Sequence, residues 1–208
     1  AGSLMVEGWN KPISCAEHDG HGAVTFRHGL QQSCNPALMQ VAEKIGTERF
    51  FNYFEALGYT SITGIDLPGE AKGITSSREE FGPVSLAVYS FGQTFKTTPI
   101  QQITAISTIA NGGYAITPHV LKEIVDDDGK VIKSYETNIK RQVISSDVCE
   151  EITIVLEDGV SGDGGAKNAY VKGYKVAAKT GTSEKLDKVD ENGKKYIHMS
   201  GNIYYNDG

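Results

Sequence analysis

Helical and strand patterns follow one another in blocks along this 208-residue chain, and this order restricts the folds open to it. Four stretches show apolar residues at the three-to-four spacing of an amphipathic helix: 33–46, 47–57, 98–110 and 145–158. Four others have strand character: 120–125, 131–135, 174–178 and a segment that begins at 203. Because helices and strands segregate into blocks, we predict an α+β fold in which helices pack on an antiparallel sheet.

Local signals refine two of the expected helices. In the first helix, Ser33 or Asn35 is the expected N-terminal cap, and Gly46 is the expected end. The helix over 98–110 is expected to turn one apolar stripe to the core: Ile103, Ile106, Ile109 and Ala110.

Turn and loop signals complete the expected secondary structure. The acidic turn at 126–129 predicts a hairpin between the strands that flank it. The glycine- and proline-rich stretch at 58–83 predicts a long loop, and 1–32 is expected to be irregular. The charged stretch at 183–195 is expected to form a hairpin or a mobile loop.

Composition limits the classes of function. The formal net charge of -6 argues against a nucleic-acid partner, which requires a basic face. No apolar run approaches the ~18 residues that cross a bilayer, so the chain itself is expected to be soluble. Cys15, Cys34 and Cys149 are an odd number of cysteines without a Cys-x-x-Cys pair, which predicts free buried thiols rather than a disulfide framework.

Two short polar motifs carry the chemistry of the sequence. Ser33 and Asn35 stand one residue apart at a helix start, where both side chains can project into one cleft, although helix capping is the ordinary alternative. Lys179 ends the strand predicted at 174–178, and an ordinary strand end followed by a turn is the alternative there. A lysine in this position supplies positive charge beside a cleft.

The residues after Lys179 suit the binding of a carboxylate substrate. The hydroxyls of Thr180 and Thr182 can hold a carboxylate, and Gly181 leaves room for substrate along the backbone. The amide after the glycine can donate to a developing oxyanion. A lysine, two hydroxyls and an amide together indicate acyl transfer.

The order of these motifs resembles that in class B penicillin-binding proteins, where a Ser-x-Asn motif precedes a Lys-Thr-Gly motif. Other blocks between about residue 15 and 183 are similar to the same family: Cys15 with Asp19-Gly20-His21-Gly22, Leu30-Gln31-Gln32-Ser33-Cys34-Asn35-Pro36, Gly64-Ile65-Asp66-Leu67-Pro68-Gly69-Glu70, Ser90-Phe91-Gly92-Gln93, Thr98-Pro99, Gln101-Gln102, Ala110-Asn111-Gly112-Gly113 and Ala177-Ala178-Lys179-Thr180-Gly181-Thr182. The resemblance implies the penicillin-recognising fold, a five-stranded antiparallel sheet between helices. It also implies that residues 1–208 are part of one transpeptidase domain, with its motifs at 33–35 and 179–181.

The resemblance further implies a DD-transpeptidase that binds the D-Ala-D-Ala end of peptidoglycan stem peptides and β-lactam antibiotics, without a cofactor. Ser33 would relay a proton to the leaving amine, and Asn35 would bind the substrate amide and a lysine of the family's nucleophile motif. Lys179 would give electrostatic support and position Ser33. Thr180 and Thr182 would hold the substrate carboxylate, with the Thr182 amide as half of an oxyanion hole. A parent protein anchored at the extracytoplasmic face of the bacterial membrane is the expected setting.

The nucleophile of that family lies in a Ser-x-x-Lys motif, and no serine of these 208 residues has a lysine three positions later. We therefore expect a domain incomplete at both ends, whose isolated chain is inactive. A non-catalytic binding or scaffold module of the same fold is the alternative, and labelling by a fluorescent penicillin separates the two.

A metal site at Cys15, His18 and His21 is a further alternative, with Asp19 and His28 nearby. The Cys-x2-His-x2-His spacing is not a standard structural zinc spacing. We therefore expect no metal there, and instead a glycine-rich loop whose histidines pack or form hydrogen bonds.

Overall fold

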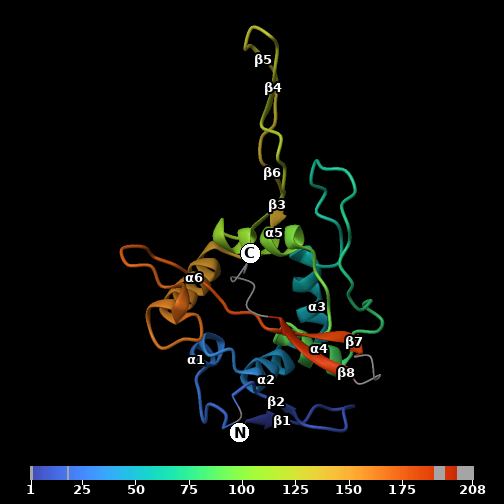
Figure 1. The fold of residues 1–208 in the computed structure, drawn as a ribbon, viewed down its shortest axis with the longest axis vertical. Helices are drawn as coiled ribbons and strands as arrows, with labels where there is room; N and C mark the ends of the chain where they lie inside the picture. Colours follow the sequence, from blue (N-terminus) through green and yellow to red (C-terminus); the bar gives the residue numbers. More distant parts are fainter. Residues whose placement is uncertain (1, 18, 190–194, 201–208) are drawn as a thin grey trace. The chain divides into compact units, whose positions relative to one another are not determined.

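The computed structural model describes residues 2–17, 19–189 and 195–200. The chain divides into two units, the first made of Ala1–Phe50, Ser76–Phe95 and Ile154–Gly208, and the second of Phe51–Thr75 and Lys96–Thr153. Figure 1 labels their helices and strands. Two helices, α3 (Thr47–Ala56) and α6 (Ser146–Ser161), pass from one unit into the other.

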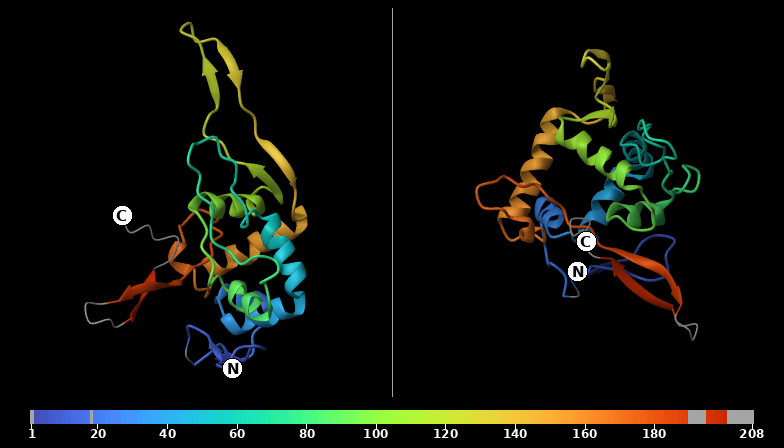
Figure 2. Two further views of the ribbon diagram at one scale, coloured as in Figure 1. Left: turned by 90° about the vertical axis from the view of Figure 1, so that its right-hand side faces the viewer. Right: turned by 45° about the horizontal axis from the view of Figure 1, so that its top comes forward.

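The first unit is built around helix α2. This unit contains the strands β1 (Ser3–Leu4) and β2 (Ile13–Ser14), the helices α1 (Phe26–Gln31), α2 (Asn35–Ile45) and α4 (Pro83–Ser90), the 3-10 turn η1 (Lys167–Ala169), and the strands β7 (Ser183–Val189) and β8 (Lys195–Ser200). Helix α2 contacts α1, α4, β1 and β2, and is therefore central to this unit. Strands β7 and β8 pair antiparallel and leave the helices as a two-stranded ribbon in both views of Figure 2.

The second unit is a helix with two antiparallel ladders. It contains α5 (Pro99–Ala110), β3 (Tyr114–Thr117) paired with β6 (Asn138–Gln142), and β4 (Glu123–Val125) paired with β5 (Val131–Ser134). The β4–β5 hairpin continues the β3–β6 ladder away from α5, and confirms the hairpin predicted at the acidic turn.

Aromatic side chains fill much of the core of the first unit. Phe81 meets Tyr89 edge-on with ring centroids 5.0 Å apart, and Tyr89 packs on Phe95 at 4.8 Å. Phe50 stacks on Phe81 at 5.9 Å.

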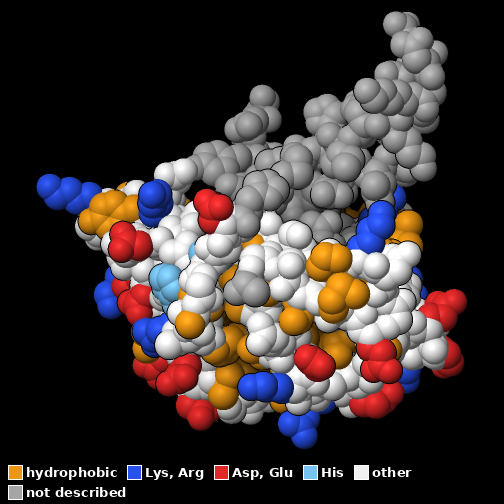
Figure 3. Space-filling view, turned by 90° about the horizontal axis from the view of Figure 1, so that it is seen from below, with side chains coloured by type: hydrophobic (Ala, Val, Ile, Leu, Met, Phe, Trp, Pro, Cys, Tyr) orange, Lys and Arg blue, Asp and Glu red, His pale blue; other side chains and the backbone are white. Residues whose placement is uncertain are grey.

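All three cysteines are free and buried, which confirms the prediction from their number and spacing. On the face drawn in Figure 3, apolar side chains gather near the middle, with acidic and basic side chains around them.

The four predicted helices are present, but the expected face of α5 is wrong. Ile103 and Ile106 are 60% and 39% exposed, while Gln101 and Thr108 are each 1% exposed. Gln101 forms a capping box with Thr98 and donates to the Ser61 carbonyl at 2.6 Å. The Thr108 hydroxyl donates to the Thr104 carbonyl at 3.0 Å. Because their hydrogen bonds are made, these polar side chains can be buried where apolar ones were expected.

The strand predicted at 174–178 is absent, and Lys179 to Thr182 lie in an extended segment just before β7. The described residues form four two-stranded sheets rather than one five-stranded sheet. A strand exists only where another strand satisfies its backbone groups, and 174–182 have no such ladder among the described residues. The segment that begins at 203 lies outside the described residues.

Helix α1 lies within residues 1–32, which were expected to be irregular. Helix α4 begins at the end of the loop predicted at 58–83 and continues where no element was predicted. Of the two alternatives expected at 183–195, a hairpin or a mobile loop, the antiparallel pairing of β7 with β8 supports the hairpin. No helix in the described part of the chain combines the length and the apolar character that crossing a membrane requires.

Candidate active site

The first motif occupies the junction between α1 and α2, in the first unit. Cys34 N–H donates to the Gly29 carbonyl at 2.9 Å, and Ser33 N–H donates to the Leu30 carbonyl at 3.1 Å. These two bonds close a Schellman motif at the end of α1. Ser33 holds the left-handed position of that motif, with φ 53°, which is usually occupied by glycine. This backbone conformation costs a serine stability, and residues held in such strained conformations cluster at active sites.

Neither Ser33 nor Asn35 caps α2, contrary to the sequence-based expectation. The N-cap is Cys34, which makes no side-chain cap bond, and Asn35 is the first helical residue. The Asn35 side-chain amide instead donates to the Ser14 carbonyl at 3.1 Å. Ser33 is therefore free to direct its hydroxyl elsewhere, and Asn35 ties the start of α2 to β2.

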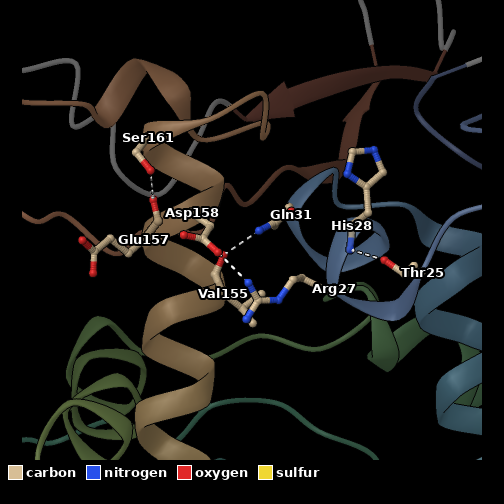
Figure 4. Close-up of polar contacts among 8 residues, drawn as sticks. All are labelled: Thr25, Arg27, His28, Gln31, Val155, Glu157, Asp158 and Ser161. Carbon is tan, nitrogen blue, oxygen red and sulfur yellow. Dashed lines mark hydrogen bonds and ion pairs between the residues drawn. The ribbon is translucent and has the colours of Figure 1, made fainter.

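Helix α1 is held against the C-terminal half of α6, as Figure 4 shows. Arg27 pairs with Asp158 at 2.6 Å, and the Gln31 side chain donates to the Val155 carbonyl at 3.0 Å. The Arg27–Asp158 pair is half-exposed and contributes little stability by itself. The Arg27–Asp158 pair and the Gln31 bond together orient α1 against α6, and so they position Ser33 at the end of α1.

The turn after α6 continues this arrangement toward the second motif. Gly165 N–H donates to the Gln31 carbonyl at 3.1 Å, so the turn is anchored on α1. Gly164 packs directly on the backbone of Gly159, where a Cβ atom would overlap the Gly159 carbonyl. Glycine at 164 is therefore required by close backbone approach.

A small apolar cluster then fixes the segment that carries Lys179. Val160, Ala166 and Ala178 are buried together, with Ala169 and Val176 packed against them. Residues from the end of α6, the turn η1 and the extended segment thus converge, and Lys179 follows directly from a buried position. The extended segment is placed by this packing, without a strand partner.

The Lys179 ammonium donates to the Ser33 hydroxyl at 2.7 Å and to the Thr180 carbonyl at 2.9 Å. Burial lowers the pKa of Lys179 from 10.5 to about 8, because a charged amine loses solvation there. Among the described residues no carboxylate pairs with this ammonium. The two motifs, 146 residues apart in sequence, therefore meet through one charged hydrogen bond.

The predicted site residues that follow Lys179 differ in how exposed they are. Thr180 and Gly181 are partly buried, and Thr182 is exposed. The Thr182 carbonyl accepts from the Gln93 side chain at 2.9 Å. Gln93 was not singled out as a site residue from the sequence, although it ends the block Ser90-Phe91-Gly92-Gln93.

The chain is similar to known proteins in sequence and in fold. A family model described as the penicillin binding protein transpeptidase domain matches residues 3–205. Stage V sporulation protein D of Bacillus subtilis is 41% identical over 175 residues, which cover 84% of this chain and 27% of that protein. Peptidoglycan D,D-transpeptidase FtsI of Escherichia coli is 25% identical over 183 residues, covering 88% of this chain and 29% of that protein.

A solved structure supports the same fold. The crystal structure of penicillin-binding protein 3 from Mycobacterium tuberculosis, complexed with ampicillin, superposes with a TM-score of 0.82 at 25% identity. The likeness covers 94% of this chain and 43% of that one. The chain thus spans less than a third of the two curated relatives named above.

Proposed function

Because the chain belongs to the transpeptidase domain family of penicillin-binding proteins, we propose that residues 1–208 are part of one class B transpeptidase domain that cross-links peptidoglycan by serine acyl transfer. The proposed substrate is the D-Ala-D-Ala end of a stem peptide, and β-lactams are proposed to compete for the same site. The penicillin-binding protein solved with ampicillin supports the second part. The proposed place of action is the extracytoplasmic face of the cell membrane.

One observation carries the proposal: the hydrogen bond of 2.7 Å from Lys179 to Ser33. A lysine whose pKa is lowered to about 8 by burial is charged at neutral pH yet can exchange its proton near neutrality. Beside it, the Ser33 hydroxyl can both accept and donate a proton. We assign Ser33 the relay of a proton to the leaving amine, and Lys179 the orientation and polarisation of that hydroxyl.

The residues next to this pair are assigned to substrate binding. The hydroxyls of Thr180 and Thr182 are proposed to bind the terminal carboxylate, whose charge the Lys179 ammonium attracts. Gly181 is proposed to leave space for the substrate backbone, and the Thr182 amide to donate to the oxyanion. Asn35 is proposed to bind the substrate amide, for which its side chain must exchange its bond with the Ser14 carbonyl.

Ser33 is not proposed as the nucleophile. Acylation needs a serine beside a base, and the family supplies it from a Ser-x-x-Lys motif that these 208 residues do not contain. This feature also favours the second candidate, a non-catalytic binding or scaffold module of the same fold. Covalent labelling by penicillin distinguishes the transpeptidase from the scaffold module, because only the transpeptidase is acylated.

The test uses a protein in which these residues are joined to a Ser-x-x-Lys segment of the same family. Lys179→Ala should slow acylation by fluorescent penicillin on the order of 100-fold or more, since a charge near the reacting atoms acts on the transition state. The matched control is Lys175→Ala. The Lys175 side chain is 87% exposed, and its ammonium pairs with the Glu157 carboxylate at 3.7 Å rather than with a residue of the two motifs. That control should leave acylation unchanged.

Thermal melting of both variants separates catalysis from folding. A folded Lys179→Ala protein that acylates at the normal rate would refute the assignment of Lys179. A melting temperature that collapses while the surviving folded fraction acylates normally would make Lys179 structural. No labelling of the joined protein at all would favour the scaffold module.

A further inference from the structure

Three potential metal ligands meet beneath the first motif, in the first unit. Cys15 follows β2, His21 lies in the loop before α1, and Cys34 is the N-cap of α2. Their ligand atoms all lie within 4.8 Å of one another. The Cys15 Sγ and His21 Nδ1 atoms are 3.6 Å apart. From the sequence, Cys15 and the histidines were weighed as a metal site and no metal was expected; Cys34 was not considered with them, because it lies farther along the sequence.

The backbone around this cluster holds the ligands in place. Cys15 N–H donates to the Gly2 carbonyl at 2.7 Å, and Cys34 N–H is held by the Schellman bond to Gly29. The Asn35 side chain bonds the residue before Cys15. Both sulfur-bearing side chains are buried, with Cys15 4% and Cys34 5% exposed, whereas His21 is partly exposed and gives a route for entry. The cluster is therefore preformed and reachable.

The spacing suits a tetrahedral metal. Bond lengths of about 2.3 Å for zinc–sulfur and about 2.05 Å for zinc–nitrogen, at the tetrahedral angle, put sulfur and nitrogen about 3.6 Å apart. The distance between Cys15 and His21 matches this value. Cys34 has to approach by about 1 Å at most, since two sulfurs on one zinc lie about 3.8 Å apart.

We propose that Cys15, His21 and Cys34 bind one Zn²⁺ ion through two thiolates and one imidazole, with a water molecule in the fourth position. On binding, each thiol releases one proton to solvent, and no atom is oxidised or reduced. Among the described residues, His28 and Asp19 are outside the cluster, and Asp19 is exposed. His18, which was weighed from the sequence, lies outside the described residues.

The position of the site gives it a consequence. Cys34 stands between Ser33 and Asn35, so a metal on its sulfur ties the loop at 15–21 to the start of α2. Metal occupancy should therefore stabilise the strained backbone that presents Ser33. The importance of this consequence for catalysis rests on the proposed function, which gives Ser33 a catalytic role. The binding of zinc itself does not rest on the proposed function.

The experiment measures zinc in the purified 208-residue chain with its thiols kept reduced. After incubation with zinc and removal of the excess, elemental analysis is expected to give one zinc per chain. Replacement of zinc by Co²⁺ should produce the thiolate-to-cobalt charge-transfer absorption. Cys15→Ser, Cys34→Ser and His21→Ala should each lose at least ten-fold in affinity.

Two matched controls keep the test specific. Cys149→Ser removes the third buried thiol, and His28→Ala removes a histidine that lies outside the cluster, so both should retain one zinc per chain. Circular dichroism identifies variants that fold poorly. Cobalt absorption then reports whether those variants still bind metal. No zinc uptake by the reduced chain would overturn the proposal. So would uptake that survives all three ligand substitutions, or a cobalt complex without thiolate absorption.

Discussion

Replacing Ser33 by alanine and by glycine separates the two properties that the structure gives this residue. Its backbone is left-handed, with φ 53°, and its hydroxyl accepts a bond from Lys179 at 2.7 Å. Both Ser33→Ala and Ser33→Gly remove the hydroxyl. Only Ser33→Gly also removes the Cβ atom, which is the source of strain in left-handed backbone.

The expected difference follows from two opposing terms. A left-handed backbone costs an L-residue roughly 1–2 kcal/mol, whereas glycine loses about 0.5–1 kcal/mol more conformational entropy on folding. Ser33→Gly should therefore be more stable than Ser33→Ala by about 0.5–1 kcal/mol. In a chain of this size that difference raises the melting temperature by roughly 1–4 °C.

Urea unfolding and thermal melting, followed by circular dichroism, measure this difference. Ser85 provides the matched control, because it lies within helix α4, where glycine should be less stable than alanine by about 1 kcal/mol. The order of the two variants should thus reverse between the positions. If glycine is not favoured at 33 while Ser85 behaves as expected, the argument from left-handed strain is wrong.

Three other predictions concern the same site. Because burial lowers the pKa of Lys179 to about 8 from 10.5, the unfolded chain holds a proton that the folded chain has lost between these pH values. The free energy of unfolding should therefore rise by about 1–3 kcal/mol from pH 8 to 10.5, and Lys179→Met should remove this rise in pH-dependent urea melts. The 208-residue chain alone should form no covalent adduct with penicillin; a stoichiometric increase in intact mass located on Ser33 would contradict this. Lys179, Thr180 and Thr182 should bind sulfate weakly, and crystals soaked in sulfate that show density elsewhere but not here would count against such an anion site.

The local sequence was sufficient for several elements because their signals are short-range. The helix predicted over 98–110 is present as α5, and Thr98 forms a complete capping box at its start. Gly46 ends α2 as expected. Helix α1 was missed because its six residues are too few for a periodic pattern.

The face of α5 could not be predicted from periodicity. Gln101 is buried because the Ser61 carbonyl, 40 residues away, accepts its hydrogen bond at 2.6 Å. A partner so distant has no signature in the helix itself. The isoleucines that dominate the pattern, Ile103 and Ile106, are left exposed among the described residues as a result.

By itself, the sequence determined the family, the class of fold and the order of the two motifs, because these depend on residue types at short spacing. Only the tertiary structure decided which of these residues meet. The 2.7 Å bond from Lys179 to Ser33 crosses 146 residues and depends on the packing of α1, α6 and the cluster around Ala178. Cys34 joins Cys15 and His21 for the same reason: contacts between distant segments are set by burial and by hydrogen bonds between them, which no local pattern encodes.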